Sequence, residues 1–348
     1  MKIRVLGGGL YGSHLAVAFM KDGHEVELHE IADRLFAGAS GNIPARLHQG
    51  FHYPRSKLTR DACRDHRAEF MARYGHLTHG VPVNIYAIAE EDSLVDFGTY
   101  TELVREIEHL AIEKPAEFGL SRVEGAILTR ERHLVTDRMR QHFTLALGDR
   151  VTFGVTPGMV DDPAWDLTID ATFCAHEGFG VDRFEACLTL LLEGPSDRAV
   201  TIMDGPFPSL YPWSEEKGLS SLTSAKWTPL ARRTTWKDAR YYLDHELSPI
   251  IIAKHAVAML DQMAEYYPAV RDYRVVEHRL AIRALPRSAA DARLVDVVPI
   301  GKGAIRIRAG KLDAVFHAER VVRRMMAIGF TREDHPRLAG LRIGAVAA

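Results

Sequence analysis

The sequence has few cysteines, and none stands close to another. Its 348 residues include three, Cys63, Cys174 and Cys187. An odd number of widely spaced thiols forms neither the disulfide framework of a small secreted protein nor the close pairs that hold zinc. We therefore expect reduced thiols and a cytoplasmic location. His76 and His79 lie three residues apart, but no third ligand stands near them in the sequence, so we predict no metal site.

Long apolar runs and an excess of charge of one sign are also missing. No window approaches the roughly 18 apolar residues that a membrane helix needs. The first apolar run, residues 3–6, is too short for a signal peptide. Lys and Arg number 44 against 46 Asp and Glu, a net charge of −2. We therefore expect neither nucleic acid nor a membrane as a partner, and the oligomeric state stays open.

Apolar residues are nevertheless plentiful. They make up 47% of the chain, which is ample for a large core, and the length suits two domains. Helical patterns cover residues 57–75, 99–111 and 250–266, and short alternating segments between 199 and 245 indicate an antiparallel sheet.

A glycine-rich loop stands close to the start of the sequence. Gly7, Gly9 and Gly12 follow the apolar run over 3–6 and precede a helical pattern. In this G-x-G-x-x-G arrangement the first glycine permits a tight turn, and the second lets a pyrophosphate approach the backbone. The third packs the helix against the strand. The start of the helix then offers N–H groups and partial positive charge to the phosphates.

An acidic residue completes this pattern. Glu30 ends a second alternating strand, about 20 residues after the last glycine, where an acid binds a ribose hydroxyl. An NAD domain would continue directly with further strands. Here the chain enters a polar loop, and an apolar strand over 165–173 returns later with the small residues Ala171 and Thr172. This organisation favours FAD over NAD as the cofactor.

Three segments resemble the D-amino-acid oxidase family, a group of two-domain FAD oxidoreductases. The first runs from Gly7 to Glu30, and the second covers residues 39–58, whose end is similar to L-2-hydroxyglutarate dehydrogenase. The third is Gly310-Lys311-Leu312, similar to a Gly-Gly-Lys turn of the family, with Ala309 at the first position. A lysine at a helix start suits the negative charge of a reduced flavin near N1 and O2.

The resemblance implies a set of cofactor-binding residues drawn from all three segments and from the returning strand. They are Gly7, Gly9, Leu10, Tyr11, Gly12, Glu30, Ser40, Asn42, Arg46, His48, Ala171, Thr172, Gly310, Lys311 and Leu312.

Three residues are candidates for catalysis. His52 could act as a base at neutral pH, or it could only hydrogen-bond the flavin or the backbone, the role favoured for His48. Arg46 could hold an acidic substrate group or a flavin oxygen, or form a surface ion pair. Arg283 stands among apolar residues, where it could bind a substrate carboxylate or phosphate, or pair internally with Asp or Glu.

The predicted fold is an α/β Rossmann-like FAD-binding domain with a discontinuous α+β domain that carries an antiparallel sheet and binds the substrate. The FAD-binding domain is expected over 1–75, 150–190 and 290–348, and the substrate domain over 76–149 and 191–289.

The expected function is oxidation of a CH–OH or CH–NH group of a small polar substrate, acidic or not, by hydride transfer to flavin N5. A non-redox flavoenzyme such as a nucleotide-sugar mutase and an NAD(P)-dependent reductase are the alternatives. The sequence names neither the substrate, nor oxygen or a quinone as the electron acceptor, nor covalent or non-covalent attachment of FAD.

Overall fold

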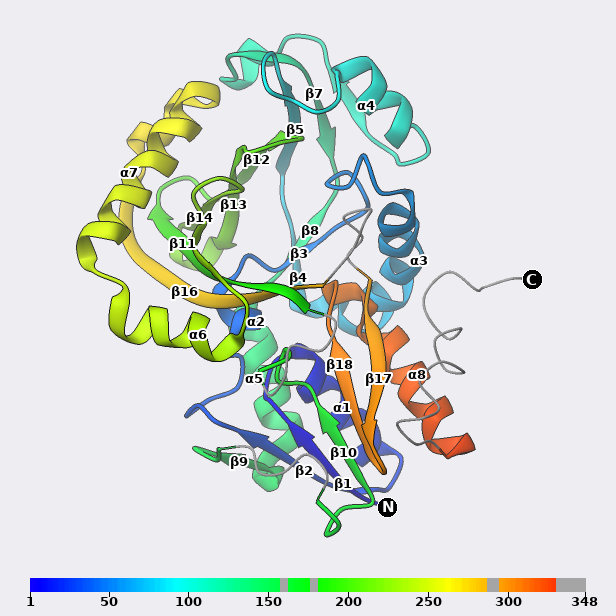
Figure 1. Ribbon diagram of the computed structural model, residues 1–348. Coiled ribbons are helices and arrows are strands. Elements are labelled where there is room, and N and C mark those ends of the chain that lie inside the picture. Colours follow the sequence, from blue (N-terminus) through cyan, green and yellow to red (C-terminus); the bar gives the residue numbers. More distant parts are fainter. Residues whose placement is uncertain (157–161, 176–180, 287–293, 330–348) are drawn as a thin grey trace.

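A six-stranded sheet forms the lower part of the molecule (Figure 1). The computed structural model describes residues 1–156, 162–175, 181–286 and 294–329. The strand order is β17-β18-β10-β1-β2-β9, and all neighbours are parallel except the β17–β18 hairpin. The strands are β1 (Lys2–Leu6), β2 (Glu25–Glu30), β9 (Val151–Phe153), β10 (Leu167–Asp170), β17 (Asp296–Gly301) and β18 (Ala304–Arg308).

Helices pack apolar side chains against this sheet. Leu15 and Phe19 of α1, Phe143 of α5 and Phe316 of α8 are buried in one cluster with Ile3 of β1. The helices of this part are α1 (Leu10–Lys21), α2 (Ala39–Asn42), α3 (Lys57–Tyr74), α5 (Thr136–Leu147) and α8 (Val315–Ile328).

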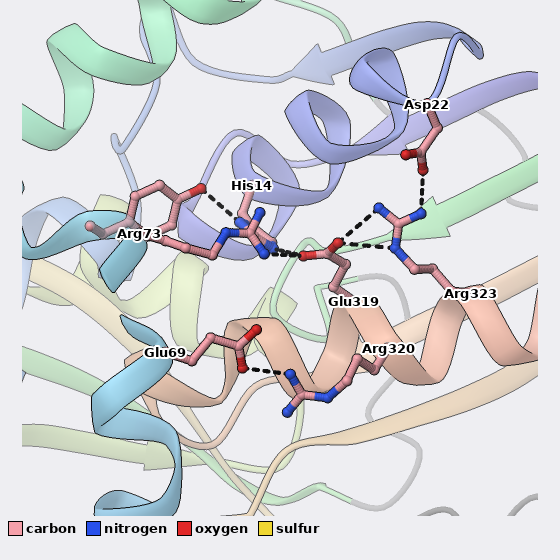
Figure 2. A network of polar contacts seen from close by, with 8 residues as sticks. His14, Asp22, Glu69, Arg73, Glu319, Arg320 and Arg323 are labelled. Carbon is pink, nitrogen blue, oxygen red and sulfur yellow. Dashed lines mark hydrogen bonds and ion pairs between the residues drawn. The ribbon is translucent and has the colours of Figure 1, made fainter. Parts of the chain in front are cut away.

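A polar network joins three of these helices (Figure 2). His14 of α1 lies between the hydroxyl of Tyr74 in α3, at 2.7 Å, and the carboxylate of Glu319 in α8, at 2.8 Å. Arg73 and Arg323 bind the same carboxylate at 3.1 and 2.8 Å. The network therefore holds α1, α3 and α8 together on one side of the parallel sheet.

A nine-stranded sheet forms the upper part of the molecule, with α7 along one side (Figure 1). Its order is β15-β11-β14-β13-β12-β5-β7-β6, with β16 also paired to β11. The strands are β5 (Val83–Ala89), β6 (Leu110–Ile112), β7 (Val123–Thr129), β11 (Val181–Glu193), β12 (Arg198–Met203), β13 (Pro208–Ser214), β14 (Leu219–Ser224), β15 (Pro229–Arg233) and β16 (Arg274–Pro286). The helices are α4 (Phe97–Val104), α6 (Trp236–Tyr241) and α7 (Pro249–Tyr266).

A third, small sheet adds strands near the junction of the two parts. Its order is β3-β8-β4, and the strands are β3 (Arg46–Leu47), β4 (Thr78–Gly80) and β8 (Arg132–Leu134). β3 belongs to the polar loop that follows β2, so this sheet fixes the loop to the chain between the two large sheets.

The α/β fold with a parallel and a largely antiparallel sheet confirms the predicted fold class. Two segments pack with a different part of the molecule from the domain predicted for them. Residues 181–190 are part of β11 in the nine-stranded sheet, whereas α5 packs against α1 of the dinucleotide-type part. The helix expected over 99–111 ends at Val104, because residues 110–112 pair with β7 as an edge strand.

The described residues contain no helix long and apolar enough to cross a membrane. The three cysteines are buried free thiols. No cluster of potential metal ligands occurs in the described ranges.

Candidate active site

The glycine loop is packed so tightly that side chains do not fit. Gly7 has a φ of +95°, and a Cβ there would lie 2.8 Å from the carbonyl oxygen of Ala171. A Cβ on Gly12 would lie 1.9 Å from the carbonyl oxygen of Gly7. Gly12 therefore lets α1 approach the β1 turn, as expected of the third glycine of such a loop.

A cavity of about 730 Å³ opens at this loop and has walls from both large sheets. Its size is within the usual range of small-molecule sites. The predicted site residues that line it are Gly7, Gly9, Leu10, Tyr11, Glu30, Ser40, Ala171, Thr172, Arg283, Gly310, Lys311 and Leu312. Gly12, Asn42, Arg46, His48 and His52 do not line it.

Backbone N–H groups hold Glu30 beside the glycine loop. Its carboxylate accepts from the N–H of Gly8 at 2.5 Å and from that of Ala32 at 2.9 Å. Ser40 of α2 packs against the first turn of α1. Its Oγ accepts a hydrogen bond from the backbone N–H of Leu10 at 3.1 Å. A carboxylate and a hydroxyl thus lie at the cavity wall beside the start of α1.

Asn42 hydrogen-bonds to the backbone that precedes it. Its Nδ2 donates to the carbonyl oxygens of Ala37 and Gly38, at 2.6 and 3.0 Å. These bonds close the short helix α2 on itself. Asn42 therefore shapes the turn that presents Ser40, and its own side chain is directed at the backbone.

The turn before α8 connects two of the sequence motifs. The hydroxyl of Tyr11, in the glycine-loop helix, donates to the carbonyl oxygen of Lys311. The Lys311 ammonium donates to the hydroxyl of Tyr53 and lies 3.9 Å from the centre of its ring. Lys311 therefore places a positive charge at the cavity wall, between the glycine loop and the polar loop.

The end of β10 is fixed by a buried ion pair. Arg306 of β18 donates to Asp170 at 2.7 Å, and both side chains are buried. The other oxygen of Asp170 accepts from the hydroxyl and the N–H of Thr172, at 2.6 and 3.1 Å. Asp170, which the sequence analysis did not single out, thus orients the cavity-lining backbone at Ala171 and Thr172.

Arg283 forms an internal ion pair, which was one of the two roles predicted for it. Its guanidinium donates to Glu185 at 2.6 Å, and Arg183 and Arg232 bind the same carboxylate at 3.2 and 3.1 Å. Burial opposes ionisation, but Arg283 and the other two arginines lower the pKa of Glu185 overall. Arg283, bound to this carboxylate, also reaches the cavity wall.

Among the described residues, Arg46 has no acidic partner within ion-pair distance. Its guanidinium lies over the ring of Tyr211, 4.3 Å from the centre, and donates to Thr201 Oγ1 at 3.3 Å. Both partners belong to the nine-stranded sheet, so Arg46 bridges the polar loop and that sheet.

The two histidines of the polar loop are brought together. The rings of His48 and His52 are stacked with centres 5.0 Å apart, and the ring of Tyr53 meets both edge-on. Burial, followed by the positive charges of Lys311 and Arg46, lowers the pKa of His48 well below its usual value. Burial also lowers the pKa of His52, where His48 and Arg46 add to the effect. The lowered pKa values favour neutral imidazoles near pH 7.

Sequence reasoning missed the acid beside this pair. Glu131 lies between β7 and β8, is 0% exposed, and accepts from Tyr86 at 2.6 Å. It also contacts His48 Nδ1 at 3.3 Å. A glutamate in a charged Arg-Glu-Arg turn gives no local signal of burial, so only the three-dimensional structure identifies it.

These features fit an FAD molecule. The tight glycines leave backbone exposed at the start of α1, whose N-cap, Gly9, provides no side-chain bond of its own. Glu30, Ser40 and Lys311 line the same cavity as the start of α1. A parallel sheet with such a cradle, joined to a second sheet that closes the same cavity, defines the FAD-binding oxidoreductases of the D-amino-acid oxidase fold.

Comparison with known proteins identifies the family more closely. No family model matches the sequence. The chain is 34% identical over 333 residues to the FAD-dependent monooxygenase FPY4 of Fusarium mangiferae, a match that covers 91% of this chain and 89% of that protein. The chain therefore belongs to the family of FAD-dependent enzymes that includes this monooxygenase. The prediction of FAD is confirmed at the level of the family.

Solved structures show the same fold. Glycine oxidase from Geobacillus kaustophilus superimposes with a TM-score of 0.67 at 13% identity, covering 100% of this chain and 99% of that one. NikD, an unusual amino acid oxidase, gives a TM-score of 0.68 at 12% identity, with coverage of 97% and 96%. These likenesses confirm the D-amino-acid oxidase fold, whereas the local similarity to L-2-hydroxyglutarate dehydrogenase stays a prediction.

Proposed function

We propose that the protein binds FAD in this cavity and oxidises a CH–OH or CH–NH group of a small polar substrate. Bound FAD would supply the acceptor, flavin N5, for the hydrogen that leaves carbon with its electron pair. The observation that carries the proposal is the cavity that the glycine loop, Glu30 and Lys311 share with β16 of the second large sheet.

The residues around the cavity would divide the work. Glu30, Ser40 and the glycines would hold the ribose and pyrophosphate, and Lys311 would face the pyrimidine end of the flavin. Arg283, which lines the cavity, carries positive charge suited to an acidic group on the substrate. The polar loop would provide the base, with His52 as the candidate expected from the sequence.

The partner of this site is thus a small molecule, and we propose a cytoplasmic protein on the basis of the three free thiols. The domain that carries the nine-stranded sheet would select the substrate, since β16 supplies the cavity wall that contains Arg283.

Anaerobic mixing tests the proposal. The FAD-loaded protein is mixed, without oxygen, with amino acids, 2-hydroxy acids and sugar derivatives. A substrate of the proposed kind bleaches the flavin absorbance with no other reductant present. A panel that leaves the flavin oxidised throughout would refute dehydrogenation.

Oxygen insertion is a second candidate, favoured by the name of the 34% identical relative. A monooxygenase of this kind would need an external reductant such as NAD(P)H, and label from ¹⁸O₂ would enter the product. Bleaching by NAD(P)H alone, followed by incorporation of label, would establish oxygen insertion. Bleaching by the substrate alone, with hydrogen peroxide or a reduced quinone as the second product, would establish dehydrogenation.

A further inference from the structure

Helix α6 and the π-helical turn that follows it, Tyr242–Glu246, present one face to the cavity. The residues of this segment in the cavity wall are Trp236, Arg240, Leu243 and Asp244. The last three follow the first by four, seven and eight positions, a spacing that places all of them along one side of a helix. Ala239 and Tyr242, between them, are buried in the protein instead. The segment packs on β11, β15 and β16, so it reaches the cavity from the part that carries the nine-stranded sheet.

Two sets of packing contacts bring this face of α6 close to the glycine loop. Trp236 and Phe173 pack against the same buried cluster. Phe173 stands two residues after Ala171, whose carbonyl oxygen packs closely against Gly7. The short helix α2, whose Ser40 binds the first turn of α1, packs on β16 beside α6 (Figure 1). The cavity face of α6 therefore lies near the start of α1, where backbone N–H groups suit a pyrophosphate.

The glycine loop itself provides no cation for a pyrophosphate. Residues 7–13 contain no Lys or Arg, and the acidic side chain of Glu30 binds to the loop backbone. A pyrophosphate has a negative charge on each phosphate, whereas the start of a helix offers only a partial positive charge. A cation supplied by another element would therefore strengthen the binding of a pyrophosphate here.

Three Lys or Arg side chains of the described residues line the cavity, and their partners differ. Lys311 contacts the polar loop, and Arg283 is bound to the buried Glu185. Arg240 pairs with Asp244, its neighbour on the same face of the helix, at 2.7 Å. The Arg240 side chain is 55% exposed, and an exposed pair of this kind is weak. Arg240 is therefore the cavity cation that can bind a further anion at the lowest cost.

The bond between Arg240 and Asp244 uses only one nitrogen of the guanidinium. Asp244 accepts from Nε, so the N–H donors of Nη1 and Nη2 form a second edge of the group. Such a planar fork matches two oxygens of a phosphate. Asp244 lies in the π-helical turn, a form of helix that is frequent at functional sites.

We propose that Arg240 of α6 binds the pyrophosphate of FAD, so that the part with the nine-stranded sheet holds the cofactor as well as the substrate. This inference rests on the proposed binding of FAD in this cavity and adds a cofactor contact to it. An acidic group of the substrate offers the same anionic oxygens, and the experiment separates the two.

Titration of the full-length, FAD-free protein with FAD, followed by flavin fluorescence, tests the contact. Arg240→Met should raise the dissociation constant about tenfold or more, the effect of losing one charge-assisted contact. Arg240→Lys keeps the charge without the fork, so its affinity should lie between those of Arg240→Met and the wild type. The difference between Arg240→Met and the wild type should shrink as NaCl is added, because salt screens a partly exposed contact.

ADP identifies the part of the cofactor that Arg240 contacts. ADP carries the pyrophosphate without the flavin, so its competition with FAD should weaken by a similar factor in Arg240→Met. Unchanged competition by ADP would place Arg240 beside the flavin or the substrate and overturn the proposal. An unchanged FAD affinity would overturn it as well, and weaker binding of an acidic substrate alone would assign Arg240 to the substrate.

The matched control is Arg271→Met. Arg271 also pairs with an aspartate, Asp261, in an exposed position, and neither residue lines the cavity. This variant should bind FAD and ADP like the wild type, and an equal loss in both variants would mean that total charge, not a contact, sets the affinity. Urea unfolding should find both FAD-free variants as stable as the wild type, because both ion pairs are exposed.

The outcomes for Arg240 are distinct from those for the proposed function. A wild-type protein that binds no FAD contradicts the proposed function. A wild-type protein that binds FAD as tightly as Arg240→Met contradicts only the role of Arg240. Bound flavin that no substrate bleaches contradicts the proposed oxidation, and the affinities of the variants still decide whether Arg240 holds the cofactor.

Discussion

Gly12 lies where α1 passes closest to the turn that follows β1. A Cβ at this position would stand 1.9 Å from the carbonyl oxygen of Gly7, so helix and turn would have to separate. We expect Gly12→Ala to destabilise the FAD-free protein by about 3 kcal/mol, at the upper end of overpacking costs, and to abolish FAD binding. Urea unfolding and FAD titration measure the two effects.

Gly38→Ala is the control for that substitution. A Cβ at Gly38 meets nothing within 4 Å, so the free energy of unfolding should change by less than about 0.5 kcal/mol. If both variants were equally stable, close packing between α1 and the β1 turn would not be the reason that position 12 requires glycine.

The charge of Lys311 allows a second prediction. Its ammonium lines the cavity, and a cation at the pyrimidine end would stabilise a reduced flavin. Lys311→Met should slow anaerobic flavin reduction about tenfold or more, the effect of losing one charge-assisted contact, and lower the flavin reduction potential. Lys302→Met, in the exposed turn between β17 and β18, should change neither quantity. An unchanged potential in Lys311→Met would place the flavin elsewhere.

Individual residues differ in how far the sequence could define them. Gly12 and Glu30 belong to a local pattern whose geometry follows from spacing, and both lie where that pattern places them. Arg283 could be recognised as a buried charge, but its partner Glu185 is 98 residues away and could not be named. Glu131 had no signal at all, because its burial results from the way β7, β8 and the polar loop meet.

At the scale of elements, α1, α3 and α8 depend on one carboxylate (Figure 2). Glu319 binds His14, Arg73 and Arg323. Burial opposes ionisation, but the bonds from His14 and Arg323 lower the pKa of Glu319 to about 2. Replacing this carboxylate with an amide would leave the buried His14 imidazole and the Arg73 and Arg323 guanidinium groups with a weaker, neutral acceptor.

Glu319→Gln should therefore destabilise the protein by about 3 kcal/mol at pH 7. An acid whose pKa is lowered by folding contributes stability above its unfolded pKa, about 4.3, and loses it as pH falls toward the folded value of about 2. The difference between wild type and Glu319→Gln should consequently narrow below about pH 4.3. Urea unfolding at several pH values measures it.

Glu69→Gln provides the comparison for this network. Glu69 binds Arg320 at 2.5 Å between α3 and α8, but both side chains are partly exposed. Its loss should cost less than about 1 kcal/mol. A cost as large as that of Glu319→Gln would mean that burial does not set the strength of these pairs.

The elements themselves were predictable where their contacts are local. β1, α1 and β2 follow each other within 30 residues and were expected with nearly correct limits. β11 and β16 are 13 residues each and pair along most of their length, yet about 80 residues of chain separate them. Their pairing, and therefore the domain to which residues 181–190 belong, depends on contacts that no local pattern encodes.

At the scale of the whole molecule, the cavity has walls from both large sheets. The parallel sheet contributes the glycine loop, Ala171 and Lys311. The other part contributes Trp236 and Arg240 of α6 and the stretch of β16 around Arg283. Figure 1 shows α6 and β16 beside α2, at the junction of the two parts. FAD bound here would contact both parts, so its removal should loosen both.

This arrangement predicts how FAD changes stability across the molecule. With free FAD at 100 times its dissociation constant, the free energy of unfolding should rise by about 2.7 kcal/mol. Hydrogen exchange should slow in the glycine loop and also in α6 and the middle of β16. Helix α7 provides no cavity residue and serves as the internal control. Protection confined to the parallel sheet would show that the second sheet does not form part of the cofactor site, since a wall in contact with FAD cannot remain as mobile as in the FAD-free protein.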